Sequence, residues 1–274
     1  MFKKKNTAIY ILLFFLALFG SSCKPRIIRR TRRVKDTSLA RVKINRRIVV
    51  GIRGKYLPFS NTVQNNYSGF DVEIAREVAK ELNVQIEFRP LSWQETARSL
   101  EDGTVDCLWS AFDPSDFSNK KFIFSDPYIK STQTIFLPRE SIHTSLESLK
   151  NRDIGFLSMG DSLINAGVKD TALRDFPNVK IYHDLELAID DVYRKKIDVI
   201  IGDIFVLNNR VSLGENIMML NEPIKQSAYS VVFKGTDESL RNKINEVLIK
   251  LEYDGVLEEI SRKWFNTNMI IIGK

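Results

Sequence analysis

Apolar and polar residues follow two periods along the chain, one typical of strands and one typical of helices. Three short apolar runs predict strands, and they lie at 47–51, 84–88 and 105–109. Helices are predicted between them, over 71–82 and 93–101. In the first helix, Ile74, Val78 and Leu82 form one stripe with charged residues opposite. This β-α-β-α-β order is typical of a parallel sheet with helices on its faces.

A second set of alternating segments follows. Short strands are predicted over 153–156, 179–182, 198–201 and 230–233. Helices are predicted near 162–168 and 185–194, and another begins at Asp203. The chain closes with two amphipathic helices, whose apolar stripes are Leu240, Ile244, Val247, Leu248 and Leu251, and then Leu257, Ile260 and Trp264. The predicted fold class is therefore α/β, and two α/β units are the natural division.

The first 22 residues have the layout of a secretory signal. Three lysines precede an apolar run over 8–19, and Gly20, Ser21 and Ser22 then lead to Cys23. The run is shorter than the ~20 residues that span a bilayer, which favours a signal peptide over a stable anchor. A cysteine directly after small residues resembles the bacterial lipoprotein signal, which implies that Cys23 receives a lipid. An ordinary cleaved signal, or an uncleaved anchor, is the alternative.

Composition narrows the class of protein. With 274 residues, 43% of them hydrophobic and 27% charged, the chain is neither a disordered chain, a collagen nor a polytopic membrane protein. Two cysteines and two histidines exclude a disulfide scaffold and argue against a zinc or iron–sulfur site, so no metal and no cofactor is expected. Cys107, in an apolar run, is expected to be a buried and inert thiol.

The positive charge is concentrated at the N-terminus. Residues 1–47 hold 14 basic residues and one acid, whereas the other 227 residues hold 27 basic and 33 acidic ones. The acidic body argues against a nucleic-acid-binding domain. The segment 23–46 is predicted to be an extended basic tether, drawn to anionic lipid by about 1 kcal/mol per charge. A plain solvated spacer and a nucleic-acid arm are the alternatives, and export disfavours the arm.

No catalytic motif is visible. The sequences GxGxxG, GxxxxGK[ST], HExxH and GxSxG are all absent. His143 and His183 lie among polar residues and are expected at the surface rather than as catalytic bases. Without a nucleophile and base, the sequence favours binding over catalysis, and the chain is expected not to be an enzyme.

Six segments in order resemble one known family. They are 49–60 (VVGIRGKYLPFS), 67–82 (YSGFDVEIAREVAKEL), 91–111 (LSWQETARSLEDGTVDCLWSA), 124–131 (FSDPYIKS), 199–203 (VIIGD) and 251–265 (LEYDGVLEEISRKWF). Together they are similar to the family 3 extracellular solute-binding proteins of ABC importers, the polar amino-acid group. The resemblance extends over about 47–265, which is nearly the whole body.

The resemblance implies a type II periplasmic-binding-protein-like clamshell of two lobes, each a sheet flanked by helices. Lobe 1 is expected to contain 47–133 and 228–274, and lobe 2 to contain 134–227. Two crossing strands, near 132–136 and 226–229, are expected to form the hinge. A small solute is expected to bind between the lobes, and closure around it to present a surface to the transmembrane subunit of an ABC permease. Such a protein works outside the cytoplasmic membrane, on the periplasmic or cell-surface side.

The resemblance also implies site residues. Tyr56 and Trp93 match two aromatic positions that flank the ligand, and a cation over such a ring gains about 0.5–2 kcal/mol. The alternative is that both are core residues. Asp203 lies at the carboxyl end of a strand, where α/β sheets bind ligands, and is expected to pair with an α-ammonium group. The alternative for Asp203 is a helix N-cap. Gly160 and Asp161 open a helix whose backbone N–H groups are expected to meet a carboxylate.

One segment departs from the family pattern. The position of the carboxylate-binding arginine holds Ser118, that of a backbone-donating glycine holds Ala111, and that of a hydroxyl-bearing threonine holds Asp113. A bidentate arginine fork is hard to replace. Arg53, at the end of the first strand, is expected to pair with a ligand carboxylate or with Asp113.

These positions lead to a hypothesis about the solute and leave two rival functions. Asp113 and Asp203 facing two aromatic rings suit a cation, so the hypothesis is a small amine-bearing solute, such as an amino acid. The first rival is an enzyme on the same scaffold, a dehydratase of cyclohexadienyl acids. The second is a ligand-binding sensor or a surface interaction protein without a transport role.

Overall fold

Strand β1 (Arg47–Arg53) lies in the middle of the first group of strands. The computed structural model describes residues 35–117, 121–157, 176 and 178–274. Strand β1 pairs in parallel with β5 (Gln85–Leu91) on one side and with β6 (Cys107–Phe112) on the other. Helices α3 (Phe70–Glu81) and α4 (Trp93–Glu101) form the two crossovers. The predicted β-α-β-α-β unit is confirmed.

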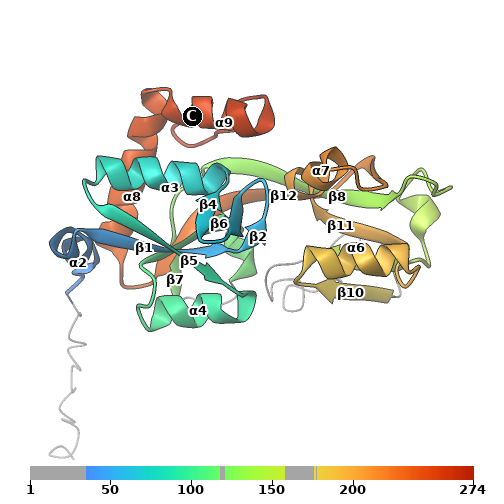
Figure 1. Ribbon diagram of the computed structural model, residues 1–274, viewed down its shortest axis with the longest axis horizontal. Helices are drawn as coiled ribbons and strands as arrows, with labels where there is room; N and C mark the ends of the chain where they lie inside the picture. The colour runs from blue at the N-terminus through green and yellow to red at the C-terminus, as the bar shows by residue number, and fades with distance from the viewer. Residues whose placement is uncertain (1–34, 118–120, 158–175, 177) are drawn as a thin grey trace, which may run out of the picture. The chain divides into compact units, whose positions relative to one another are not determined.

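Both faces of β1 are covered. Alternate side chains of a strand point to opposite faces. Val50 shares a buried cluster with Ile74 of α3, whereas Val49 shares another with Leu100 of α4. Figure 1 shows the two helices on opposite sides of these strands. Because neither face meets water, the strand is one continuous apolar run rather than an alternating one.

A small separate sheet follows β1. Its three strands are β2 (Lys55–Tyr56), β3 (Ser60–Val63) and β4 (Asn66–Ser68), and they pair antiparallel. The sequence predicts no strand here, because strands of two to four residues are too short to show a period. This sheet fixes the chain immediately after Arg53 and holds Tyr56 opposite Ser60.

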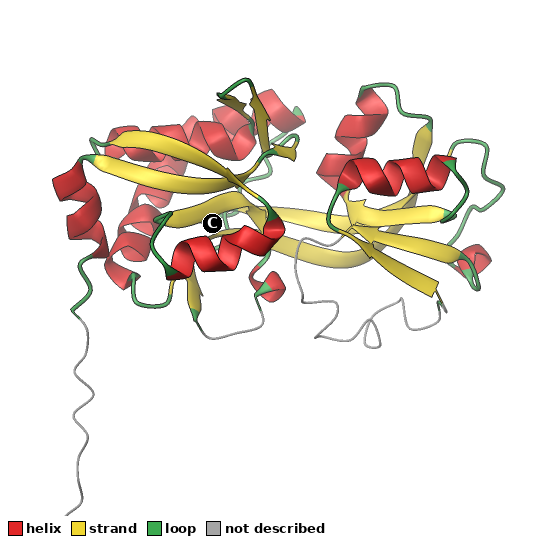
Figure 2. Ribbon diagram, turned by 60° about the horizontal axis from the view of Figure 1, so that its bottom comes forward, coloured by secondary structure: helices red, strands yellow, loops and turns green. Residues whose placement is uncertain are grey.

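Two long strands join the two groups of strands. Strand β8 (Ile129–Pro138) pairs antiparallel with β12 (Ile217–Lys234), and both strands are visible in Figure 2. Strand β12 also pairs with β6 and β7 (Phe122–Phe124), and β8 also pairs with β11 (Val199–Asp203). The crossing segments predicted from the resemblance fall in this pairing, where Thr132 is opposite Gln226. The strand predicted over 230–233 is only the end of β12, whose earlier residues alternate between half-buried and exposed positions.

The second group of strands has the order β10-β9-β11. It consists of β9 (Asp153–Leu157), β10 (Asn178–Tyr182) and β11, which are parallel to one another. Helix α6 (Leu185–Tyr193) follows β10, and α7 (Ile204–Ser212) follows β11. The three strands and both helices confirm the predictions for this region. The helix predicted near 162–168 lies outside the described residues.

Helix α2 (Ser38–Asn45) corrects one prediction. It lies within 23–46, for which the sequence predicts an extended tether, so that prediction is wrong for the residues of this helix. Ser38 and Val42, one helical turn apart, are buried, while the basic residues of the helix are exposed. The exposed charges dominate the sequence pattern, and two buried positions are too few to form a visible stripe.

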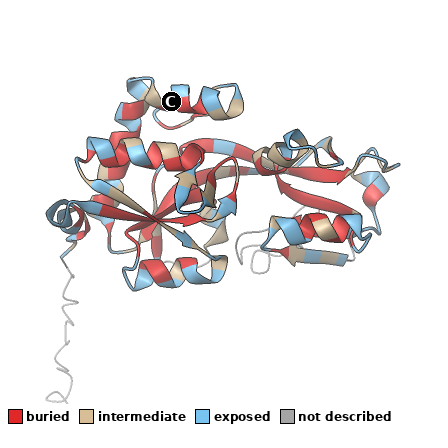
Figure 3. Cartoon of the chain, in the orientation of Figure 1, coloured by how far each residue is buried: buried red, intermediate tan, exposed pale blue. Residues whose placement is uncertain are grey.

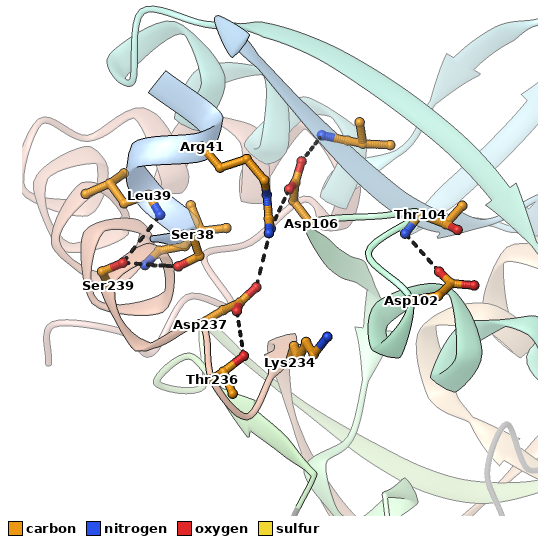
Figure 4. A network of polar contacts seen from close by, with 12 residues as sticks. Ser38, Leu39, Arg41, Asp102, Thr104, Asp106, Lys234, Thr236, Asp237 and Ser239 are labelled. Atoms are coloured by element: carbon orange, nitrogen blue, oxygen red, sulfur yellow. Dashed lines mark hydrogen bonds and ion pairs between the residues drawn. The ribbon is translucent and has the colours of Figure 1, made fainter. Parts of the chain in front are cut away.

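Polar contacts attach α2 to the body. Arg41 Nη2 lies 3.0 Å from Asp106 Oδ1 and 3.5 Å from Asp237 Oδ2, which Figure 4 shows together. The Ser239 backbone N–H donates to a carboxylate oxygen of Asp36, and Ser38 Oγ lies 3.1 Å from Ser239 Oγ. The folded body therefore includes α2 and does not begin only at β1.

Helices α8 (Glu238–Tyr253) and α9 (Val256–Phe265) follow β12, and their predicted apolar stripes are buried except for Trp264, which is half-buried. Figure 3 shows buried residues along the strands and on the sheet-facing sides of the helices. Cys107 is fully buried with a free thiol whose pKa burial raises well above its usual value, which confirms its predicted state. Among the described residues, no helix has the length and apolarity that a membrane span needs.

Candidate functional site

A pocket of about 400 Å³ brings together three of the residues expected at the site. Arg53, Tyr56 and Trp93 line it from the end of β1, from β2 and from the start of α4. Asp184 and Glu186, at the start of α6, also line the pocket, and this helix belongs to the second group of strands and helices. Arg53 and Tyr56 come from one segment of the sequence and Trp93 from another, and the fold places them around one cavity.

Arg53 is a buried cation without a hydrogen-bond partner. Arg53 is one of the residues that line the pocket, yet it is only 5% exposed and its three side-chain nitrogens are buried. Its guanidinium carbon lies 4.2 Å from the ring centroid of Tyr56 and 4.6 Å from that of Phe112. None of its three side-chain nitrogens has a hydrogen-bond partner among the described residues. Burying a charge in this way is costly, and the ring faces offset only part of that cost.

The aromatic residues of the pocket are held by packing. Tyr56 is 6% exposed and stacks on Phe59 with ring centroids 6.1 Å apart. Burial raises the pKa of its hydroxyl far above the usual value, against the opposing effect of the Arg53 charge. Trp93 is half-buried and packs against Phe112 and Phe117, at 6.4 and 5.7 Å between centroids. These contacts leave both rings at the pocket wall as rigid apolar surfaces.

Local sequence places Trp93 at the first position of α4. Ser92 and Glu95 form a capping box, in which the Ser92 backbone N–H donates to Glu95 Oε2 at 2.8 Å. The box fixes where the helix begins, and so fixes the direction of the indole. The polar residues around Trp93 in the sequence are therefore explained by helix capping.

Asp203 is buried and fully hydrogen-bonded within the protein. Its Oδ1 accepts from the backbone N–H groups of Phe205 and Val206, at 2.8 and 3.1 Å, and so caps α7. Its Oδ2 accepts from the hydroxyl of Ser131, at 2.5 Å, and from that of Tyr229. Burial raises the pKa of this carboxyl. The N-cap alternative is confirmed, and Asp203 is not among the described residues that line the pocket.

Ala111 and Asp113 also have partners within the protein. The backbone N–H of Ala111, at a φ of 50°, donates to Asp71 Oδ2 at 2.7 Å. Asp113 Oδ1 accepts from the Ser115 backbone N–H at 2.9 Å, and its Oδ2 lies 3.4 Å from Lys225 Nζ. The expected pairing of Asp113 with Arg53 is therefore not formed, because Lys225 takes that place.

The remaining predicted site residues, Ser118, Gly160, Asp161 and Cys23, lie outside the described residues. The described residues contain no group of three or more potential metal ligands placed to hold an ion. His143 and His183 are part-exposed or exposed residues, and His183 lines the pocket.

Sequence reasoning missed several residues of this region. Phe112 was not singled out, because it ends an apolar strand and looks like any core residue. Asp71 is completely buried, and Tyr128 also donates its hydroxyl to Asp71 Oδ1 at 2.8 Å. An acid directly after Phe70, on the otherwise apolar face of a predicted helix, was the available signal. Nothing in the sequence marked Asp184 or Glu186 as a residue of the site.

Comparisons with known proteins agree with this fold. A family model described as bacterial extracellular solute-binding proteins, family 3, matches residues 48–267. The L-cystine-binding protein TcyJ of Escherichia coli (strain K12) is 25% identical over 84% of this chain and 87% of its own length.

Two solved structures are similar in fold. That of Tv2483 bound to L-arginine has a TM-score of 0.78 at 23% identity, covering 88% of this chain and 99% of that one. A substrate-binding protein of an ABC uptake transporter from Streptococcus pneumoniae, with bound histidine, has a TM-score of 0.76 at 22% identity, covering 86% and 98%. These likenesses confirm the predicted fold class, that of the type II periplasmic binding proteins.

Proposed function

We infer that this chain, which belongs to the family 3 bacterial extracellular solute-binding proteins, captures an amino acid or a closely related amine for an ABC importer. The observation that supports this proposal most directly is the pocket. Arg53, Tyr56 and Trp93 were selected from the sequence by their positions in the family pattern, and all three line one cavity. A cation and two aromatic walls are suited to a small solute with both polar and apolar parts.

The proposal includes the place and partners of the protein. The signal-like segment 1–22 and Cys23 support export and lipid attachment, on the outer side of the cytoplasmic membrane. The basic segment before α2 is then the tether to the membrane surface. The transmembrane subunit of an ABC permease is the proposed protein partner, because the chain's relatives are amino-acid-binding proteins of such transporters.

Two lobes are proposed for the body, with the boundaries that the resemblance implies. Lobe 1 contains 47–133 and 228–274, and lobe 2 contains 134–227. Strands β8 and β12 are the proposed hinge, since they pair with both groups of strands. A solute that prefers the closed arrangement shifts the lobes toward it. The protein is proposed to bind its solute and not to transform it.

Asp203 can bind the solute only after one of its present hydrogen bonds is broken. A carboxylate has about four acceptor positions, and the four hydrogen bonds of Asp203 use them. An ammonium group therefore has to displace the hydroxyl of Ser131 or of Tyr229 before it can bind Asp203. A D203N variant tests whether Asp203 contacts the solute. Loss of binding without loss of the folded state supports a ligand role, and unchanged binding contradicts it.

A thermal-shift screen tests the proposed function. The chain is melted alone and with each of the twenty amino acids, with simple amines, and with neutral sugars. A ligand at 100 times its Kd stabilises the folded state by about 2.7 kcal/mol, which raises the Tm by several degrees. A rise with one or more amino acids or amines is expected. A rise with sugars alone, or with none of these solutes, contradicts the proposal.

A further inference from the structure

We propose that Phe205 is a positioning residue, which holds the second lobe against the first so that residues of both lobes line one pocket. This inference rests on the two lobes of the proposed function and deepens that proposal. Phe205 lies in the first turn of α7, within the proposed lobe 2. Its ring contacts the rings of Phe59 and Phe265, which belong to the proposed lobe 1.

Packed aromatic rings of lobe 1 form the surface that receives Phe205. The centroid of the Phe205 ring lies 4.5 Å from that of Phe265, and 6.1 Å from that of Phe59 in an edge-to-face arrangement. Phe59 is completely buried and also packs edge-to-face on Tyr229, at 5.5 Å, whereas Phe265 packs on Phe70 at 4.8 Å. Ring pairs at such separations attract one another beyond the effect of the area that they bury. The receiving surface is therefore a fixed part of lobe 1.

The ring contact lies outside the pocket, although it determines how the pocket is formed. Phe205 is half-buried, and neither it nor its two ring partners is among the described residues that line the pocket. A change at Phe205 therefore removes no contact with a solute in that pocket. The pocket needs both lobes, because Trp93 lines it from lobe 1 and Asp184 lines it from lobe 2. The arrangement in which the rings meet is thus the one in which the pocket has both walls.

Hydrogen bonds attach the same end of α7 to the proposed hinge. The backbone N–H of Phe205 donates to Asp203 Oδ1 at 2.8 Å, and Asp203 Oδ2 accepts from the hydroxyls of Ser131 and Tyr229. Ser131 lies on β8 and Tyr229 on β12, the two strands of the hinge. The ring contact of Phe205 adds a second attachment, which opposes rotation of lobe 2 about the first one.

The effect of this attachment on binding follows from the populations of the two arrangements. A solute that needs both walls binds with an apparent Kd equal to the intrinsic Kd divided by the fraction of molecules in the two-walled arrangement. Loss of the ring contact lowers that fraction, so the affinity falls while every contact within the pocket stays the same. One ring pair is strong enough to change an equilibrium by about 2- to 10-fold.

Calorimetry and small-angle X-ray scattering of the full chain test the proposal. Calorimetry measures the Kd for the amino acid with the largest shift in the thermal screen, and scattering measures the radius of gyration without solute. F205A removes both ring contacts and is expected to weaken binding by about 10-fold and to increase the radius of gyration. F205Y keeps the ring, so its affinity is expected to stay within about threefold of the wild type. If F205A does not fold, F205L replaces it, with the same two changes expected in smaller size.

Y67A is the matched control for lost packing. Tyr67 is also a half-buried aromatic residue outside the pocket lining, but its ring packs on Phe88 within lobe 1, with centroids 5.3 Å apart. Y67A is expected to lower the Tm, to leave the radius of gyration unchanged and to bind within about threefold of the wild type.

Three results overturn the inference and leave the proposed function standing. They are wild-type affinity in F205A, an unchanged radius of gyration in F205A, and an equal loss of affinity in Y67A. If no amino acid binds the wild-type chain, the proposed function fails, and the radius of gyration of F205A alone then decides whether Phe205 holds the lobes together.

Discussion

At the scale of single residues, hydrogen bonding decides which charges remain available to a solute. Arg53 and Asp203 are both buried, charged and at the ends of strands. Asp203 accepts hydrogen bonds from its own helix and from residues of two other strands, while the Arg53 guanidinium lies against the rings of Tyr56 and Phe112. The positions of both residues could be predicted from the sequence. The difference in their hydrogen bonding could not be predicted, because Ser131 and Tyr229 reach Asp203 only in the folded chain.

Asp71 gives a prediction at the same scale. Its carboxylate is completely buried, where it accepts from the Ala111 backbone N–H and from the Tyr128 hydroxyl. Burial raises its pKa to about 7 from an ordinary value of 3.8. The folded state therefore holds this proton more tightly than the unfolded state, and the free energy of unfolding falls as pH rises between about 4 and 7. Above about pH 7 the contribution of Asp71 to the free energy of unfolding no longer changes with pH.

The variant D71N removes this pH dependence. Urea unfolding of wild type and D71N is measured between pH 4 and pH 8, with E77Q on the same helix as the control for removing a charge. The stability of D71N relative to wild type is expected to rise through the window, by up to about 1.4 kcal/mol for each unit of the pKa shift. Parallel stability curves for the two proteins would show that Asp71 does not titrate in this way.

At the scale of elements, long regular segments were predictable and short or docked ones were not. Helices α3, α8 and α9 show their apolar stripes in the sequence and bury them in the structure. The small sheet β2–β4 is too short for a period, and the docked helix α2 depends on contacts with residues far away in the chain, such as Asp106 and Ser239. Isolated helices of this length are marginal in water, so tertiary packing is what forms α2.

Two substitutions in α2 separate its apolar and ionic contacts. Val42 is 1% exposed, and V42A is expected to lower the free energy of unfolding by about 2 kcal/mol, through lost burial and a residual cavity. Arg41 has a side chain that is 43% exposed, so R41A is expected to cost less than about 1 kcal/mol despite two ion pairs. Urea unfolding measures both. A larger loss for R41A than for V42A would mean that charge, and not packing, holds the helix.

At the scale of the whole molecule, the order of segments was enough to predict the family and the α/β class. The sequence placed the crossing strands correctly because their neighbours match the family pattern, although the full length of β12 could not be seen in its half-exposed residues. The sequence also favoured a cationic solute from the presence of Asp113 and Asp203. In the structure both acids have partners within the protein, Lys225 for Asp113 and Ser131 for Asp203.

Tryptophan fluorescence tests whether the solute binds in this pocket, because Trp93 lines it while the other two tryptophans, Trp109 and Trp264, do not. Wild type and W93F are titrated with the amino acid that gives the largest shift in the thermal screen, with calorimetry in parallel. We expect a saturable change in wild-type fluorescence that W93F loses while it still binds the amino acid by calorimetry. A full fluorescence change in W93F, or saturable binding with no fluorescence change in wild type, would mean that the solute binds outside this pocket.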